Sequence, residues 1–350
     1  MKLTLAIIFS SISLFFLAQT ATASEKPVKA GIVNITETGS ATNSTQIQWL
    51  ELKDAKNQSI FIKNMEQPLS KFNKYQIGEE LLIQKPDEST EYIITDYYRQ
   101  SSLAILFWIF MAVVLIVGKF YGFSSLAGMA FSLFFIVKVI LPQISSGVNP
   151  VLVVLSASII LIPVTFYLSH GINTKTNLAI LGTLISAAIT AILALIFTHL
   201  AHLNGFASED ASFLDVAKNG AINIQSLLIS GIIIGSIGVL DDVSVSQVSV
   251  IKELSETNPN LTFPELFKKS MSVGRDHVAS MVNTLFLVYT GAAMPLILLF
   301  MDNNMTFTEI INTQLISEEV VRTLVSSIGL ILAVPTTTFM AAKFYTKSKN

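Results

Sequence analysis

Long apolar runs separated by short polar breaks fill the chain from Ser101 to its C-terminus. A helix needs about 20 apolar residues to cross a bilayer, and it satisfies its backbone hydrogen bonds internally. The runs are too long and too little alternating for strands of a membrane barrel. Residues 101–350 are therefore predicted to form an α-helical transmembrane bundle of about seven spans, at about residues 102–120, 122–141, 150–169, 177–200, 221–241, 278–301 and 320–343.

The composition agrees with a polytopic membrane protein surrounded by a lipid bilayer. Hydrophobic residues make up 51% of the chain and charged residues only 13%, about half the charged share of an average soluble domain. The formal net charge of −2 excludes a basic nucleic-acid-binding protein. The chain has no cysteine, which excludes disulfides and thiolate chemistry, and we expect no metal site and no cofactor.

The first 23 residues have the features of a secretory signal peptide. Lys2 gives a positive start, Leu3 to Ala18 are mostly apolar, and Ala21-Thr22-Ala23 fits a cleavage site. An uncleaved anchor is the alternative. Either reading places the segment that follows outside the cytoplasm.

Residues 24–100 form the only polar stretch long enough for a separate domain. Five segments of period-2 alternation, separated by turn residues, predict a small extracytoplasmic all-β domain, either a barrel or a sandwich. We see no catalytic set in it and expect a structural or recognition role. The predicted strands are Val28–Ile35, Thr45–Leu52, Ser59–Lys63, Glu80–Gln84 and Tyr92–Thr95.

The positive charges predict the orientation in a cell (plasma) membrane, because cytoplasmic loops carry an excess of Lys and Arg. With the β-domain outside, the outer breaks hold Lys138, Lys218 and Arg322. The C-terminus is then cytoplasmic. The inner breaks hold Lys119, Lys175, Lys252, Lys268, Lys269, Arg275, Lys343, Lys347 and Lys349.

Span five combines a glycine face with two acids. Gly231, Gly235, Gly238 and Asp242 lie on one face of a helix, and Asp241 points about 100° away. Glycines on one face allow a neighbouring helix to approach closely, so Gly235→Leu should disrupt folding more than Ile233→Leu. Carboxylates within a span are functional candidates. Alternatively, the acids only mark the cytoplasmic end of the span, although apolar residues 243–251 favour continuation of the helix.

Span six begins after Arg275 and Asp276, and Asp276 is a candidate N-cap. Ser280, Asn283, Leu287 and Thr290 follow along one face as a mostly polar stripe. The stripe fits either a polar pathway or hydrogen bonds between helices. Arg275 is a candidate ion-pair partner for Asp242, with Asp241 and His277 as competitors.

Span seven begins with an expected ion pair between Glu318 and Arg322, four residues apart. Pro335 interrupts the helix hydrogen bonding further along, and Thr337 belongs to a threonine run that can satisfy the freed carbonyls. Such a break fits an ion site or a plain kink.

The polar membrane residues coincide with four sequence motifs: Tyr97-Tyr98-Arg99, residues 238–247, residues 274–284, and residues 322–330 continuing to Pro335. Together these motifs resemble those of the YibE/F family of prokaryotic multi-pass membrane proteins. The resemblance covers the chain from about residue 90 and implies a plasma-membrane protein with an extracytoplasmic β-domain. It implies no established activity.

Three functions remain open from the sequence. The first is a transporter or channel-like protein for a small solute or ion, with a polar path through spans five to seven. The second is a non-transporting scaffold whose β-domain binds another envelope protein. The third, an intramembrane hydrolase using Asp241 and Asp242, is disfavoured because adjacent residues on a helix diverge. We therefore expect no enzymatic activity.

Overall fold

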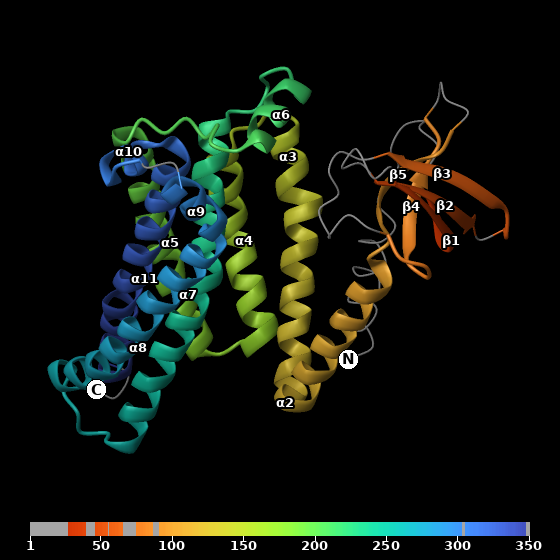
Figure 1. Cartoon of the computed structure of the whole chain (residues 1–350). Coiled ribbons are helices and arrows are strands. Elements are labelled where there is room, and N and C mark those ends of the chain that lie inside the picture. Colours follow the sequence, from red (N-terminus) through yellow and green to blue (C-terminus); the bar gives the residue numbers. More distant parts are fainter. Residues whose placement is uncertain are drawn as a thin grey trace. The chain divides into compact units, whose positions relative to one another are not determined.

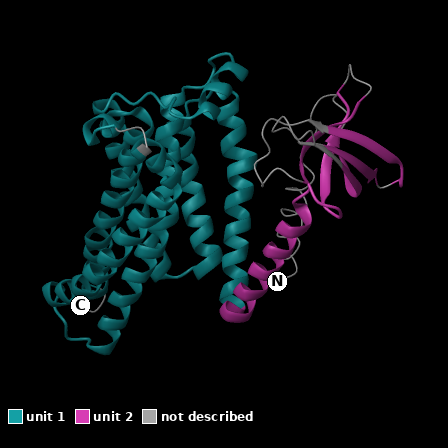
Figure 2. Cartoon of the chain, in the orientation of Figure 1, with its two compact units in different colours: residues 1–15, 120–350 teal, residues 16–119 magenta. Residues whose placement is uncertain are grey.

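The computed structural model describes residues 27–39, 46–54, 56–65, 75–86, 91–302 and 305–347. Two compact units meet in sequence between Lys119 and Phe120, and each is described by itself (Figure 2). The expected signal peptide lies outside the described residues.

The N-terminal unit contains one five-stranded antiparallel sheet with the strand order β3-β2-β1-β4-β5. All five predicted strands are present, but their described residues form an open sheet, without closing into a barrel or pairing into a sandwich. β-bulges at Ile32/Asn34 and Leu82/Ile83 shift the register. The strands are β1 (Val28–Gly39), β2 (Gln46–Asp54), β3 (Ser59–Met65), β4 (Glu80–Gln84) and β5 (Ile93–Tyr97).

The alternation of the strands sorts apolar residues to one face of the sheet. Leu50, Leu52 and Ile62 are buried there with apolar residues of β1 and β4. On β2 and β3 the intervening residues Trp49 and Phe61 are 46% and 70% exposed. The sheet thus has one packed face and one face with exposed aromatic residues.

The described residues after β5 form helices joined by loops (Figure 1). Asparagine side chains cap the first turns of three helices, at Asn149, Asn173 and Asn223. The helices are α2 (Gln100–Phe135), the π-helix η1 (Ile136–Ile140), α3 (Leu141–Ser145), α4 (Pro150–His170), α5 (Thr174–Leu200), α6 (Glu209–Ala217), α7 (Ile224–Thr257), α8 (Phe263–Ala292), α9 (Met294–Asp302), α10 (Phe307–Asn312) and α11 (Gln314–Lys347).

Five helical stretches among the described residues are long and apolar enough to cross a membrane. A sixth is possible if α8 and α9, which meet at a bend of 63°, form one broken span. One of the five, Gln100–Ser145, is 46 residues long, about twice the length that one span needs. Lys119 interrupts it with non-helical torsions (φ 49°, ψ −126°), at the boundary predicted between the first two spans.

The helical core is built around α5, α7 and α11, which pack against one another. Helices α4 and α8 each pack against α7 as well, α4 also against α5 and α8 also against α11. The contact between α5 and α11 depends on two glycines. A Cβ atom on Gly182 would overlap Thr337 Oγ1, and a Cβ atom on Gly329 would overlap Thr190 Oγ1.

These two contacts show that α5 and α11 run antiparallel. Glycine precedes threonine by eight residues in both helices, and the glycine of each helix lies against the threonine of the other. A constant shift of 147 residues (329 minus 182) superposes the two sequences with further identities. The identical pairs are Thr176/Thr323, Gly182/Gly329, Thr190/Thr337, Ala194/Ala341 and Phe197/Phe344.

The same shift also superposes the burial pattern of the two helices. The buried trio Leu178, Ala179 and Ile180 corresponds to a second buried trio at residues 325–327. Helix α7 packs against both helices. We therefore describe α5 and α11 as an inverted pair.

Candidate functional site

The predicted glycine face of α7 is exposed. A Cβ atom on Gly231, Gly235 or Gly238 would meet nothing within 4 Å. Ile233, expected to point elsewhere, is fully buried. Among the described residues these glycines therefore do not sit against another helix, contrary to the prediction. The expected difference between Gly235→Leu and Ile233→Leu loses this structural basis. Spacing identifies a shared face but not which face meets a neighbour.

The close packing of α7 and α8 occurs elsewhere. A Cβ atom on Gly274 would lie 2.5 Å from Val334 Cγ1 and 3.1 Å from Gln247 Oε1. Gln247 Nε2 donates to Thr338 Oγ1 (2.8 Å) and to the Ser270 carbonyl (3.0 Å), which ties α7 to α11 and α8. The sequence interpretation missed Gln247, although an amide side chain in the continuation of an apolar helix was a visible signal.

Two serines add a second polar link between α7 and α11. Ser236 and Ser326 share a hydrogen bond of 2.8 Å between their hydroxyls, both buried. This contact gives Ser326, four residues after Arg322 on α11, a partner on α7. Hydrogen bonds of this kind hold helices together where the surroundings are apolar.

The exposed face of α7 carries small and polar residues along much of its length. We call Gly231, Gly235, Gly238, Asp242 and Ser246 the α7 stripe; all are exposed. As the apolar residues 243–251 predicted, the helix continues past the acids, to Thr257. The acids therefore lie within α7 rather than at its end.

The two acids have different surroundings. Asp242 is exposed on the stripe, whereas Asp241 is partly buried and its Oδ1 has no hydrogen-bond partner among the described residues. Where the structure is described, no ion pair joins Asp242 to Arg275, so the predicted pairing is not present.

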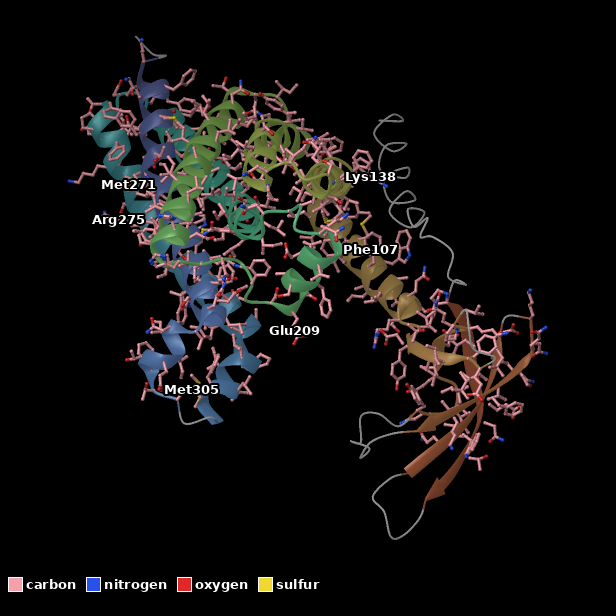
Figure 3. All side chains as sticks on the ribbon, turned by 90° about the horizontal axis from the view of Figure 1, so that it is seen from above. Phe107, Lys138, Glu209, Met271, Arg275 and Met305 are labelled. Atoms are coloured by element: carbon pink, nitrogen blue, oxygen red, sulfur yellow. The ribbon has the colours of Figure 1, made fainter. Side chains whose placement is uncertain are left out.

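The Asp242–Arg275 pair is absent from the described part of the chain because α8 begins earlier than predicted, at Phe263. Its first turn follows a capping box formed by Thr262 and Glu265, so Asp276 is not the N-cap but an exposed residue in the fourth turn. Gly274 is the residue that faces α7 and α11. Arg275, next to it, is rotated about 100° and is exposed on the outside of α8 (Figure 3).

The polar stripe predicted on span six is present but faces outward. Ser280, Asn283 and Leu287 are exposed, and Thr290 is half-buried. The hydroxyl of Thr284 donates to the Ser280 carbonyl within the same helix. For the Asn283 side chain the described residues provide no hydrogen bond to another helix, so the stripe is not explained by helix packing within one chain.

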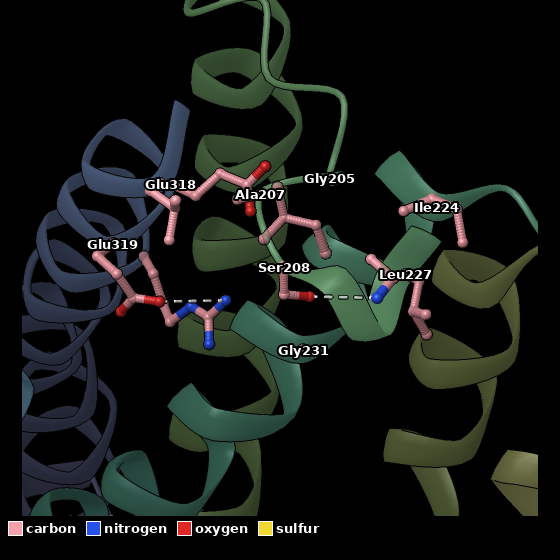
Figure 4. Close-up of a pocket in the computed structure, with 12 residues that line it drawn as sticks. Gly205, Ala207, Ser208, Ile224, Leu227, Gly231, Glu318 and Glu319 are labelled. Atoms are coloured by element: carbon pink, nitrogen blue, oxygen red, sulfur yellow. Dashed lines mark hydrogen bonds and ion pairs between the residues drawn. The ribbon is translucent and has the colours of Figure 1, made fainter. Parts of the chain in front are cut away.

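A pocket of about 270 Å³ lies at the N-terminal ends of α6, α7 and α11 (Figure 4). Glu318, Glu319 and Arg322 provide its charged wall. The other walls come from apolar residues of α7 and α11 and from the loop before α6. The remaining lining residues are Gly205, Ala207, Ser208, Ala211, Ile224, Leu227, Leu228, Gly231 and Leu315. Gly231 therefore belongs both to the pocket and to the α7 stripe.

The predicted ion pair of Arg322 has a different partner. Arg322 Nη2 lies 3.6 Å from Glu319 Oε1, while Glu318 is only 5% exposed and accepts a hydrogen bond of 2.9 Å from Gln314 Nε2. The Nε of Arg322 is buried without a partner among the described residues. Thr337 lies more than three turns along α11 and contacts α5 at Gly182, so it does not take part in the pocket.

The family comparison applies to the helical part of the chain. A family model described as YibE/F-like protein matches residues 106–347. The chain belongs to the YibE/F-like family. No curated protein and no solved structure matches it. The matched region starts within α2 and includes the α7 stripe, the pocket and the inverted pair. Family membership and the apolar helices together make this YibE/F-like protein a membrane-embedded protein.

Proposed function

We propose that this YibE/F-like protein is a transporter or channel-like protein for a small solute or ion, which moves along α7. The observation that carries the proposal is the α7 stripe, which no helix of the described chain covers. It begins at the pocket, where Gly231 is a lining residue, and continues to Asp242 and Ser246.

The stripe is poorly suited to contact with lipid. Placing an aspartate at the centre of a lipid-facing helix costs about 2.5–3.5 kcal/mol on insertion scales, and three glycines contribute almost no apolar surface. Water, a polar solute or another protein surface would lower this cost. A hydrated path is the reading that also accounts for a charged pocket at one end of the stripe.

The inverted pair supports the same function. Many secondary transporters are built from repeats of opposite orientation, and they bind substrate near the interface between the repeats. Helix α7, which carries the stripe, packs against both members of the pair. The proposal includes seven spans, with residues 24–100 outside and the C-terminus inside, in a plasma membrane.

Cysteine accessibility tests the path, because the chain has no native cysteine. If the stripe is hydrated, Gly235→Cys in proteoliposomes should react with a small hydrophilic thiol reagent. Two matched controls should stay unreactive: Ile233→Cys, which is buried, and Leu181→Cys, which is exposed on apolar α5. Reactivity of Gly235→Cys no higher than that of Leu181→Cys would place the stripe in lipid and contradict the path.

Flux measures transport directly. Purified protein in liposomes should move an ion, a proton or a small solute, and Gly235→Leu should reduce this flux by filling the stripe. The open space beside Gly235 predicts that the variant still folds. Flux equal to that of empty liposomes for all tested solutes would contradict the transport proposal.

A second candidate is a scaffold that binds an envelope protein through the β-sheet. The exposed aromatic residues Trp49 and Phe61 favour it, because exposed aromatic side chains are common in binding surfaces. This scaffold does not transport, so the native protein should show no flux in liposomes, and Phe61→Ser should abolish binding of an envelope partner. Flux by the native protein, together with unimpaired partner binding by Phe61→Ser, would argue against the scaffold role.

A further inference from the structure

We propose that the pocket binds a small zwitterion with an apolar side chain, an amino-acid-like solute. The role of this ligand as the transported solute rests on the proposed function, but its binding does not. Three features of the pocket determine the ligand class.

The first feature is one wall that carries both signs of charge. Arg322 has a buried Nε without a partner, and its long contact with Glu319 (3.6 Å) leaves the guanidinium able to bind an anion. Glu318 accepts from Gln314 through Oε1 and forms no ion pair within the described residues. A carboxylate on the ligand satisfies the guanidinium, and an ammonium on the same ligand satisfies the glutamates.

The second feature is the position of the helix ends. Helices α6, α7 and α11 all begin at the pocket, where Ser208, Ile224 and Leu315 are lining residues. Helix N-termini carry a partial positive charge and favour anionic groups. They therefore add to Arg322 and offset the excess negative charge of the two glutamates.

The third feature is the apolar wall and the size of the pocket. Leu227 and Leu228 of α7 line the pocket together with Leu315, which lies about one turn before the glutamates on α11, and the volume is about 270 Å³, slightly below the range of pockets for drug-sized molecules. In the loop before α6 only glycine fits at position 205, because φ is +85° and a Cβ atom would lie 2.7 Å from the Ile224 carbonyl oxygen. This loop therefore packs directly against the first residue of α7, and both line the pocket.

Binding can be measured on the full chain in detergent, by calorimetry and by thermal shift, without any transport. The probes are L-leucine, leucinamide, which lacks the carboxylate, and 4-methylpentanoate, which lacks the amino group. The proposal predicts that leucine binds and that each truncated probe binds at least about tenfold more weakly, the loss for one charge-assisted hydrogen bond. Equal binding of leucinamide or of 4-methylpentanoate would contradict a zwitterion site, and so would the absence of leucine binding.

Four variants localise the site. Gly231→Leu fills the pocket without changing its charge and should abolish binding, and Arg322→Gln should weaken it about tenfold or more. Gly235→Leu, one turn further along the stripe, and Glu309→Gln, on exposed α10, should bind leucine normally. Binding unchanged by Gly231→Leu would place the ligand elsewhere and contradict the proposal.

The same variants separate the two proposals. Gly235→Leu should bind leucine and lose flux, whereas Gly231→Leu should lose both. Binding of leucine to the native protein without any flux would support the pocket and contradict transport. Flux of an ion without any leucine binding would support transport and contradict the pocket assignment.

Discussion

Alanine at Gly329 is expected to destabilise the protein through the α5–α11 contact. The new Cβ atom would overlap Thr190 Oγ1 and lie 3.1 Å from Thr190 Cβ. Overpacking of this kind costs about 1–3 kcal/mol, and the gain in helix propensity returns about 1 kcal/mol. If overpacking costs about 3 kcal/mol, the upper end of its range, the net loss of folding stability is about 2 kcal/mol. Gly235→Ala, which meets nothing within 4 Å, should instead gain about 0.5–1 kcal/mol.

The assay is the melting temperature of purified variants in detergent. We expect Gly329→Ala to melt about 5 °C below the native protein, at about 2–4 °C per kcal/mol, and Gly235→Ala to melt at or above it. Thr190→Ala removes the overlapping hydroxyl, so the double variant should be more stable than the sum of the single effects by about 1 kcal/mol. Additive effects of the two changes, or a Gly235→Ala variant as unstable as Gly329→Ala, would refute the reasoning.

Three further predictions concern other parts of the chain. In intact cells an impermeant thiol reagent should label Asn57→Cys but not Ser348→Cys, and the opposite pattern would reverse the proposed orientation. Gln247→Leu should lower the melting temperature, because the buried Gln247 amide links three helices. Its loss leaves polar partners unsatisfied, which costs about 1–3 kcal/mol of stability. A melting temperature equal to the native value would show that these bonds do not contribute. Hydrogen bonds from the Thr306 amide (2.7 Å) and hydroxyl (2.8 Å) hold the pKa of Glu309 below its usual value. The α10 cap is therefore complete above the ordinary glutamate pKa and is lost as pH falls through the lowered pKa of Glu309. In acid, the Thr306 amide should then exchange faster than its intrinsic rate at that pH predicts. An exchange rate that follows the intrinsic rate at every pH would contradict this.

Local patterns account for the strands and for several helix starts. Alternation located all five strands within a few residues, because one face of the sheet is packed and the other is not. The start of α8 was missed, although Thr262 followed by Glu265 is a visible capping signal. The apolar sequence after Asp241 and Asp242 correctly indicated that the helix continues.

Contacts between helices were harder to predict. A helix with glycines on one face and serines on another offers two possible packing faces, and α7 uses the face of Ser236 and Gln247. The pairing of Asp242 with Arg275 failed for the same reason, since Gly274 sets the rotation of α8. The pocket combines α6 and α7 with α11, which lies much further along the chain, so only its charged residues were visible beforehand.

The inverted pair has a consequence for how α5 and α11 can tilt against each other. A helix with glycine and threonine eight residues apart fits an antiparallel copy of itself, because each threonine meets the glycine of the other copy. The two contacts then lie at equal distances from the crossing point, near Ser186 and Ala333. A tilt of one helix about that point would open one contact and tighten the other, so the two contacts together would resist tilting in either direction.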